Sequence, residues 1–111
     1  YEDAAESYAR SAEIYYECQN FFEAAWCYCI SGFYFILAEN NKKALAMADR
    51  AEFVCREDEI KVILNDLASV CRLISEGSIQ EARKRWSRIR MKFKGSYAKI
   101  VDSCLRSVSS R

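Results

Sequence analysis

Cysteine is the residue type in this chain best suited to metal binding or nucleophilic chemistry, but its spacing favours neither. The 111 residues contain six cysteines and no histidine, and no two cysteines have the two-residue separation common in zinc sites. On a helix, Cys27 and Cys29 would point about 200° apart, so they could not bind one ion from the same face. Most of the cysteines lie among apolar residues, where a thiol packs as a small hydrophobic group. We therefore expect free, buried thiols, a reducing cytoplasmic compartment, no metal and no other cofactor.

The acidic run Glu57-Asp58-Glu59 could in principle bind a cation. Asp58 precedes an apolar pattern of helical period, and acidic side chains at a helix start are stabilised by the helix dipole. We interpret the run as the start of a helix, with Asp58 as its N-cap. The chain also lacks a Gly-rich phosphate loop and a Ser nucleophile motif. We therefore expect a protein that is not an enzyme.

Positive charge is concentrated in the last third of the chain. The net charge is −6 in residues 1–39, −1 in residues 40–76 and +8 in residues 77–111. Most of the positive charge surrounds Trp86, Ile89 and Phe93, which on a helix share one face with Ala82. The basic residues of this cluster are Arg83, Lys84, Arg85, Arg88, Arg90, Lys92 and Lys94.

The basic helix expected at residues 82–94 has several interpretations. It could be the solvated face of an amphipathic helix, with no ligand. It could also contact an acidic protein surface, anionic lipid head groups or nucleic acid. Among these partners we favour an acidic protein, then a membrane, and nucleic acid least. Self-association is a further possibility, because the basic end of one copy could meet the acidic residues 1–39 of another.

Aromatic side chains are more numerous in residues 1–38 than two helices can bury. Four of them, Tyr1, Tyr8, Tyr15 and Phe22, form the surface that we expect to contact a partner. Arrays of helical repeats usually end in a polar cap, and the first expected helix has none. We therefore expect residues 1–111 to form one helical-repeat domain that is the C-terminal part of a longer array.

Apolar periodicity predicts six helices and no strand. Gly77 is expected to end the fourth helix, and Ser78 with Glu81 to form a capping box for the fifth. Gly32 lies inside the second helix, where a close helix crossing would compensate its poor helix propensity. The expected helices cover residues 2–18, 21–38, 41–54, 58–76, 79–93 and 96–108.

An alanine step that recurs every twenty residues predicts how these helices pack. Ala4-Ala5, Ala24-Ala25 and Ala44 are separated by about one helix and one turn. This spacing is typical of antiparallel helical hairpins that stack into a right-handed array. Such arrays usually present a surface to a partner. We therefore expect an all-α array of about six helices.

Four segments carry a family resemblance: residues 20–27 (NFFEAAWC), 43–45 (KAL), 56–59 (REDE) and 80–82 (QEA). In this order they resemble the tetratricopeptide-like repeats and, more closely, the C-terminal region of the soluble NSF attachment proteins (SNAPs). The resemblance covers about residues 3–108. It implies a cytoplasmic, non-catalytic adaptor of vesicle fusion, peripheral to membranes, that joins SNARE-type helical bundles to the AAA ATPase NSF. The ATPase-docking surface of that family is acidic, whereas the corresponding residues 67–73 contain no acid.

Overall fold

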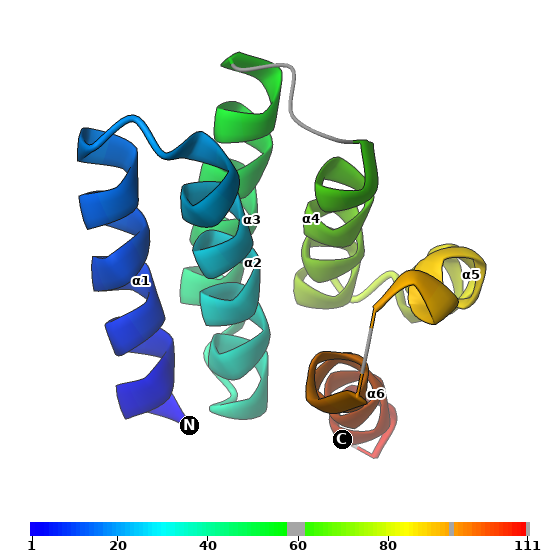
Figure 1. Ribbon diagram of the computed structural model, residues 1–111. Coiled ribbons are helices and arrows are strands. Elements are labelled where there is room, and N and C mark those ends of the chain that lie inside the picture. Colours follow the sequence, from blue (N-terminus) through cyan, green and yellow to red (C-terminus); the bar gives the residue numbers. More distant parts are fainter. Residues whose placement is uncertain (58–61, 94, 111) are drawn as a thin grey trace.

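The computed structural model describes residues 1–57, 62–93 and 95–110. These residues form six α-helices and one short 3-10 helix, and no strand occurs among them, which confirms the expected all-α array (Figure 1). Four predicted helices agree with the structure within one residue at each described end. The elements are α1 (Glu2–Glu17), α2 (Phe21–Leu37), α3 (Asn41–Glu57), α4 (Val62–Ser75), α5 (Ile79–Ile89), η1 (Arg90–Lys92) and α6 (Gly95–Ser109).

The helices of the molecule run along two different directions. Helices α1 to α4 run alternately up and down, and each packs on the next (Figure 1). Helices α5 and α6 lie across this direction and are seen nearly end-on in the same view. Helix α6 then returns to pack against α2 as well as α5 and α4. The last two helices therefore form a separate face at one side of the array.

Helix α2 is the centre of the hydrophobic core. It contacts α1, α3, α4 and α6, and most of its residues are buried, as its nearly continuous apolar sequence predicts. Its buried Ser31 hydroxyl donates a hydrogen bond of 2.6 Å to the Ala5 carbonyl of α1. The Cys104 thiol of α6 lies 3.2 Å from the Phe33 carbonyl of α2. These contacts join helices that are distant in sequence to the central helix.

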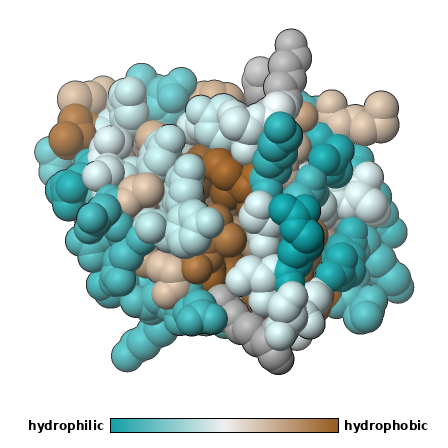
Figure 2. Space-filling model, turned by 90° about the horizontal axis from the view of Figure 1, so that it is seen from below, coloured by the Kyte–Doolittle hydropathy of each residue, from teal (hydrophilic) through white to brown (hydrophobic). Residues whose placement is uncertain are grey.

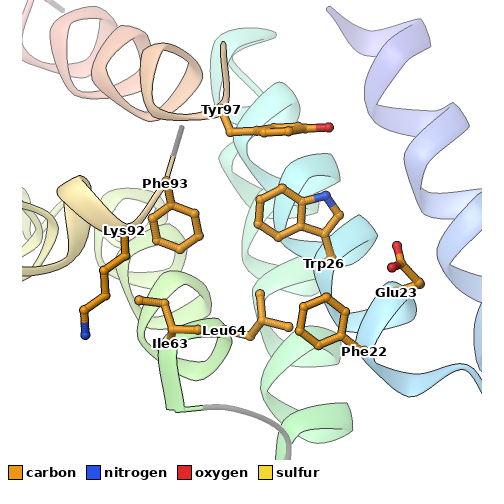
Figure 3. A pocket seen from close by; sticks show the side chains of 8 residues that line it. All are labelled: Phe22, Glu23, Trp26, Ile63, Leu64, Lys92, Phe93 and Tyr97. Carbon is orange, nitrogen blue, oxygen red and sulfur yellow. The ribbon is translucent and has the colours of Figure 1, made fainter. Parts of the chain in front are cut away.

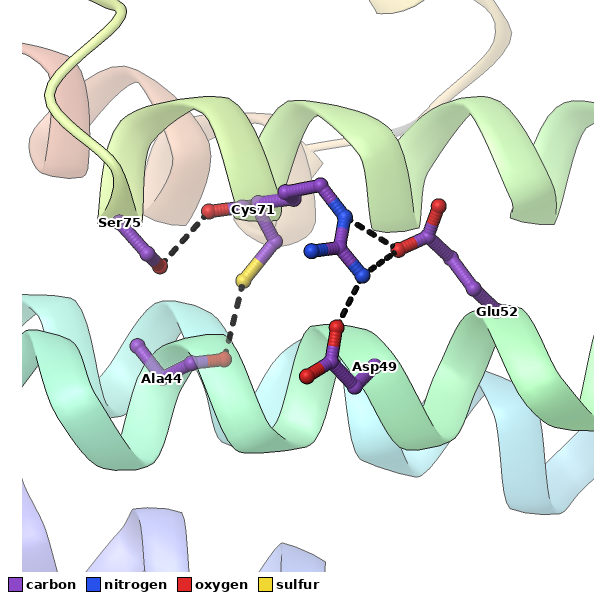
Figure 4. Close-up of polar contacts among 6 residues, drawn as sticks. Ala44, Asp49, Glu52, Cys71 and Ser75 are labelled. Atoms are coloured by element: carbon purple, nitrogen blue, oxygen red, sulfur yellow. Dashed lines mark hydrogen bonds and ion pairs between the residues drawn. The ribbon is translucent and has the colours of Figure 1, made fainter.

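Gly32 marks a close crossing of α2 with α3 and α4, as the sequence predicts. A Cβ atom at this position would lie 2.5 Å from the Cys71 Sγ atom and 3.4 Å from the Ala44 carbonyl oxygen. The Cys71 thiol in turn lies 3.9 Å from that same carbonyl (Figure 4). Beside this crossing, Arg72 of α4 donates from Nε to Glu52 of α3 at 2.6 Å and also pairs with Asp49. Apolar and ionic contacts therefore fix α4 against α3.

Three helices end in the same backbone motif, in which a residue of positive φ is followed by an N–H that bonds five residues back. The positive-φ residues are Gln19 (62°), Glu39 (62°) and Gly77 (86°). The motif explains the twenty-residue step, because each of the first two helices and its turn occupy twenty residues. It also confirms Gly77 as a C-terminal cap. The N–H to carbonyl distances are 2.8 Å for Asn20–Tyr15, 2.9 Å for Asn40–Phe35 and 2.8 Å for Ser78–Leu73.

The structure corrects the predicted ends of two helices. Helix α3 continues to Glu57 rather than ending at residue 54, so Glu57 closes α3 instead of opening the next helix. Asp58, Glu59 and the predicted start of the fourth helix lie outside the described residues. Helix α5 ends at Ile89 rather than near Phe93, because Arg90–Lys92 tighten into a 3-10 turn. Phe93 is extended, with φ −109° and ψ 141°.

The predicted capping box at the start of α5 is wrong. In the described part of the chain, the Ser78 side chain makes no capping hydrogen bond. A capping box also needs the Ser78 N–H to donate to the Glu81 carboxylate, but that N–H already donates to the Leu73 carbonyl in the turn that ends α4. Glu81 instead lies 3.8 Å from Arg85. The short connection makes two helix ends compete for one donor.

Candidate binding surface on α5 and α6

The apolar face of α5 holds its basic residues at the surface. Ala82, Trp86 and Ile89 are buried, with Trp86 only 3% exposed, and the helix packs mainly against α4. Apart from Ile79, which is partly buried against the core, the remaining positions of α5 are exposed. All the predicted basic residues that the structure describes are exposed, and Lys94 lies outside the described residues.

The structure divides the predicted basic cluster into several parts. Arg83 and Arg90 border a groove toward α6. Arg85 and Arg88 border a smaller groove that also contains Asp66 of α4 and Glu81. Lys92 lies beyond α5, at the edge of an aromatic groove. Lys84 lines none of these three grooves. Opposite charges are therefore balanced on the α4 side of the helix, and excess positive charge lies on the α6 side.

Asp102 of α6 organises the floor of the groove between α5 and α6. Its Oδ1 atom accepts the Trp86 indole Nε1–H at 2.8 Å. Its two oxygens also accept from Arg90, with Nε–Oδ1 at 3.1 Å and Nη2–Oδ2 at 2.6 Å. The Arg90 hydrogen bonds are the main reason that the pKa of Asp102 is lowered, and the Trp86 bond and the charge of Arg106 add to this effect. Asp102 therefore stays ionised at neutral pH.

Two further guanidinium groups border this groove without a carboxylate partner among the described residues. Arg83 donates to the Ser109 hydroxyl, and Arg106 donates to the Ser103 hydroxyl at 3.1 Å. Both hydrogen-bond partners are neutral, so neither guanidinium forms an ion pair with a described carboxylate, although the charge of Arg106 also acts on Asp102. The groove has a volume of about 280 Å³. We call it the arginine groove, and its lining residues are Arg83, Trp86, Ser87, Arg90, Asp102, Leu105 and Arg106.

A second groove lies where α2, α4, η1 and α6 meet. It has a volume of about 610 Å³, and rings from distant parts of the chain face one another across it (Figure 3). Phe22 and Tyr97 are 41% and 37% exposed. Lys92 and Glu23 lie on opposite sides of the groove. We call it the aromatic groove, and its aromatic residues are Phe22, Trp26, Phe93 and Tyr97.

The rings of the two grooves form one continuous series. Phe93 stacks on Trp26 with ring centroids 6.0 Å apart and on Trp86 at 5.8 Å. Trp26 also meets Tyr97 edge to face at 4.8 Å. Offset and edge-to-face contacts of this kind are favourable beyond the burial of ring area. Phe93 therefore links the aromatic groove to the Trp86 floor of the arginine groove.

Apolar side chains are also visible from the end of the molecule at which residue 1 lies. Figure 2 shows them in a hollow near the middle of this face, surrounded by hydrophilic side chains. The exposed large apolar residues of the molecule include Met91, which is 94% exposed in η1. Exposed apolar groups of this kind are available for contact with other molecules.

The four aromatic residues expected to form a contact surface do not lie together in one place. The rings of Tyr1 and Tyr8 both lie near the Tyr34 ring of α2, at 6.4 and 5.7 Å. Phe22 is at the opposite end of α2, in the aromatic groove. Tyr15 is exposed on α1. Since α1 and α2 are antiparallel, Tyr1 and Phe22 lie at opposite ends of this helical pair.

The acidic side chains of α1 face basic residues of α3. The Glu6 Oε1 atom lies 3.4 Å from Lys43 Nζ, and the Glu13 Oε1 atom lies 3.4 Å from Arg50 Nη1. Glu2 is also within 3.9 Å of Lys43. Part of the negative charge of residues 1–39 is therefore matched inside one molecule, which weakens the case for a head-to-tail contact with a second copy.

The cysteines are free, and five of the six are buried, as predicted. Burial raises the pKa of Cys55 to about 11 and that of Cys71 to about 12, and the pKa of Cys29 is raised strongly for the same reason. These thiols are therefore neutral at physiological pH. Within the described residues, no group of three or more potential Cys, Asp or Glu ligands is arranged to hold a metal ion.

Several residues of the two grooves are missing from the sequence-based prediction. Asp102 and Arg106 belong to α6, and only the crossing of α5 and α6 places them beside Arg83. Phe93 and Tyr97 reach Trp26 because the chain turns back after η1. The four-residue spacings of Phe22 with Trp26 and of Phe93 with Tyr97 are the available sequence signals, but such spacings are also ordinary in helix cores.

Among the residues that the structure describes, no helix has both the length and the apolar character needed to span a membrane. Comparisons of the chain with protein-family models, with curated proteins and with solved structures find no match.

Proposed function

We propose that this chain is a non-catalytic protein-binding module whose α5–α6 face engages an acidic protein surface. The observation that carries the proposal is that Arg83 and Arg106, on facing helices, form no ion pair with a described carboxylate and donate to neutral hydroxyls instead. Lys84 adds exposed positive charge on α5, beside Arg83. A basic patch of this kind accelerates association with an acidic partner and helps to select it.

The aromatic groove supports the same proposal because it provides apolar area beside the basic residues. Large aromatic and arginine side chains carry much of the binding energy in protein interfaces. Lys92 lies at the edge of this groove. A partner helix with apolar residues on one face and an acidic residue opposite Lys92 would match this arrangement.

The resemblance to SNAPs suggests which partner to test first. A SNARE-type helical bundle presents a helical protein surface, and an AAA ATPase of the NSF type is the second choice. In this proposal the module works in the cytoplasm, on proteins at membranes, and takes part in vesicle fusion. The support for this setting comes from the motifs at residues 20–27, 43–45, 56–59 and 80–82.

Charge reversal tests the proposal. We expect the Arg83→Glu/Arg106→Glu variant to bind an assembled SNARE-type bundle at least about tenfold more weakly, because like charges then face the acidic surface. The matched control is Arg10→Glu/Lys42→Glu, which makes the same change in net charge on α1 and α3 and should retain binding. Equal losses in both variants would show that net charge, not this face, determines binding. Calorimetric titration at two salt concentrations provides the measurement.

A second candidate function is attachment to an anionic membrane. Met91 is 94% exposed and lies between Arg90 and Lys92, so an apolar side chain with basic neighbours could enter a lipid interface. Co-sedimentation with phosphatidylcholine/phosphatidylserine vesicles separates the two functions. Strong vesicle binding that is lost in Met91→Asp would favour the membrane, whereas bundle binding that is unchanged in Met91→Asp would favour the protein partner.

A further inference from the structure

The arginine groove has an excess of about two positive charges. Among the described residues, three guanidinium groups border it, and the one carboxylate that lines it belongs to Asp102. Both oxygens of that carboxylate already accept hydrogen bonds from Arg90, and one also accepts from Trp86. Asp102 therefore compensates Arg90, while the charges of Arg83 and Arg106 face the groove with neutral serine partners.

The shape of the groove fits a small oxyanion better than an extended chain of acids. Its volume is about 280 Å³, and Arg83 and Arg106 approach from two different helices. Guanidinium groups bind phosphate through paired hydrogen bonds with matching geometry. Trp86 and Leu105 form an apolar floor and are 3% and 5% exposed, which lowers the local dielectric and strengthens the attraction.

From this arrangement we infer that the arginine groove binds a phosphomonoester dianion on the protein partner, such as a phosphorylated serine or threonine. The inference rests on the proposed function, because it specifies which acidic group of the partner enters this groove. Arg83 and Arg106 hold the phosphate oxygens from opposite walls, and Asp102 keeps Arg90 and Trp86 in place beneath them. Phosphorylation of the partner then controls the affinity.

A lipid phosphate is a less suitable source of the same chemistry. The apolar residues of the groove, Trp86 and Leu105, are buried in its floor and do not project toward a bilayer. Met91, the highly exposed apolar residue nearby in sequence, does not line this groove. A phosphate on a protruding protein side chain can reach the floor without inserting an apolar group of the groove into lipid.

The experiment titrates the chain with an alanine-based peptide that carries one phosphoserine and follows the indole N–H signals by NMR. We expect the Trp86 signal to shift, because Trp86 forms the groove floor, and the Trp26 signal to stay unchanged as an internal control. The same peptide with glutamate in place of phosphoserine should bind more weakly, since it has one charge fewer and a planar acceptor. Equal affinity for the two peptides would overturn the inference.

Variants test the role of the two arginines. Arg83→Gln and Arg106→Gln should each weaken phosphopeptide binding about tenfold, because each removes a charged hydrogen-bond donor. Arg106→Lys keeps the charge but not the fork geometry, so it should lose part of the affinity. Lys42→Gln, which makes the same change in charge on α3, away from the groove, is the control. If Lys42→Gln weakens binding as much as Arg106→Gln, the phosphate has no specific site and the inference fails.

Two further outcomes separate the inference from neighbouring explanations. Tighter, Arg106-dependent binding of vesicles that contain phosphatidic acid would identify a membrane as the phosphate source and overturn the protein assignment. Binding of an acidic helical bundle without any preference for the phosphopeptide would overturn the inference but leave the proposed function intact. If neither the bundle nor the phosphopeptide binds, both fail. Circular dichroism of each variant confirms that the helices remain folded.

Discussion

The Trp86 indole of α5 and the Asp102 carboxylate of α6 form a hydrogen bond of 2.8 Å across the crossing of the two helices. Trp86 is buried, and its N–H loses this acceptor if Asp102 is removed. Arg90 completes the arrangement from the outer side of the same carboxylate. The bond therefore combines a structural role in the α5–α6 crossing with the support of the arginine groove.

Removal of the Asp102 carboxylate should destabilise the fold more than removal of its exposed partner. We expect Asp102→Ala to lower the free energy of unfolding by about 1–3 kcal/mol, because the buried Trp86 N–H loses its acceptor. Arg90→Gln should have a smaller effect, since Arg90 is exposed and solvent screens its charge. Urea unfolding at neutral pH measures both. A larger loss in Arg90→Gln would contradict this explanation.

The same carboxylate should make stability depend on pH in the acid range. The pKa of Asp102 is lowered in the folded state, mainly by the Arg90 hydrogen bonds, while an unfolded Asp has a pKa of about 3.9. The contribution of Asp102 to the free energy of unfolding is therefore fully present above about pH 4–5 and is lost as pH falls through the folded pKa. The stability difference between the wild type and Asp102→Asn should be constant from about pH 7 to 5 and shrink below about pH 4. A constant difference down to pH 2 would refute this assignment.

A methyl group at position 32 should be tolerated only when Cys71 is smaller. Gly32→Ala places a Cβ atom 2.5 Å from Cys71 Sγ, and we expect it to destabilise the fold by about 1–3 kcal/mol through overpacking. In a Cys71→Ala background the clash is relieved, and alanine regains about 1 kcal/mol of helix propensity. A double-mutant cycle in urea should therefore show strong coupling. Additive effects would mean that the Cys71 side chain can move away from the new methyl group at no cost in stability.

Glycine should stabilise the two turns that hold other residues at positive φ. Gln19 and Glu39 have φ of 62°, a conformation that disfavours residues with a Cβ by about 1–2 kcal/mol. Glycine avoids this strain but loses more backbone entropy on folding, which offsets part of the gain. The net stabilisation in Gln19→Gly and in Glu39→Gly should therefore be about 0.5–1 kcal/mol each. Gly77→Ala is the reciprocal control and should destabilise. Thermal unfolding of the three variants measures the effect, and stabilisation by Gly77→Ala would contradict it.

Thiol reactivity should distinguish one cysteine from the other five. Cys18 is exposed, whereas Cys27, Cys29, Cys55, Cys71 and Cys104 are buried. Alkylation of the native protein at pH 8 should modify Cys18 rapidly and the rest only after unfolding, which peptide mass spectrometry can show. Cys18→Ser should abolish the rapid phase. Fast native labelling of Cys71, whose pKa is raised to about 12, would contradict the described burial.

The same raised pKa values should make the protein less stable in alkali. Unfolded thiols have a pKa of about 8.5, and burial raises the pKa of Cys55 to about 11 and of Cys71 to about 12. The neutral thiol is favoured in the folded state. Its contribution to the free energy of unfolding is therefore fully present below about pH 8.5 and is lost as pH rises toward the folded pKa. Cys71→Ala should reduce this alkaline slope.

The helices of the array follow from the sequence because they depend on local patterns. Apolar periodicity locates all six, and the alanine step and Gly77 mark helix spacing and one helix end. Errors arise where a local signal competes with another part of the chain. The Ser78–Glu81 pattern is a good capping signal in isolation, but the turn of α4 takes the Ser78 N–H first.

The candidate site is less predictable because it depends on how helices cross. The sequence identifies Arg83 and Arg90 as part of one basic cluster. It does not indicate that Asp102 compensates Arg90 or that Arg106 joins Arg83 from another helix. These relationships follow from the tertiary arrangement of α5 and α6, for which periodicity within one helix contains no information.

The return of α6 to α2 has a consequence for the order of folding. Helices α1 to α4 pack mainly on their neighbours in sequence, so they can assemble through local contacts, which favours fast folding. The Cys104–Phe33 contact joins residues 71 positions apart. Closing such a long loop costs chain entropy before the contacts between α6 and α2 can form. We predict that pulse-labelled hydrogen exchange protects α1–α4 before α6. An intermediate on this pathway would be a helical array in which the arginine groove has not yet formed.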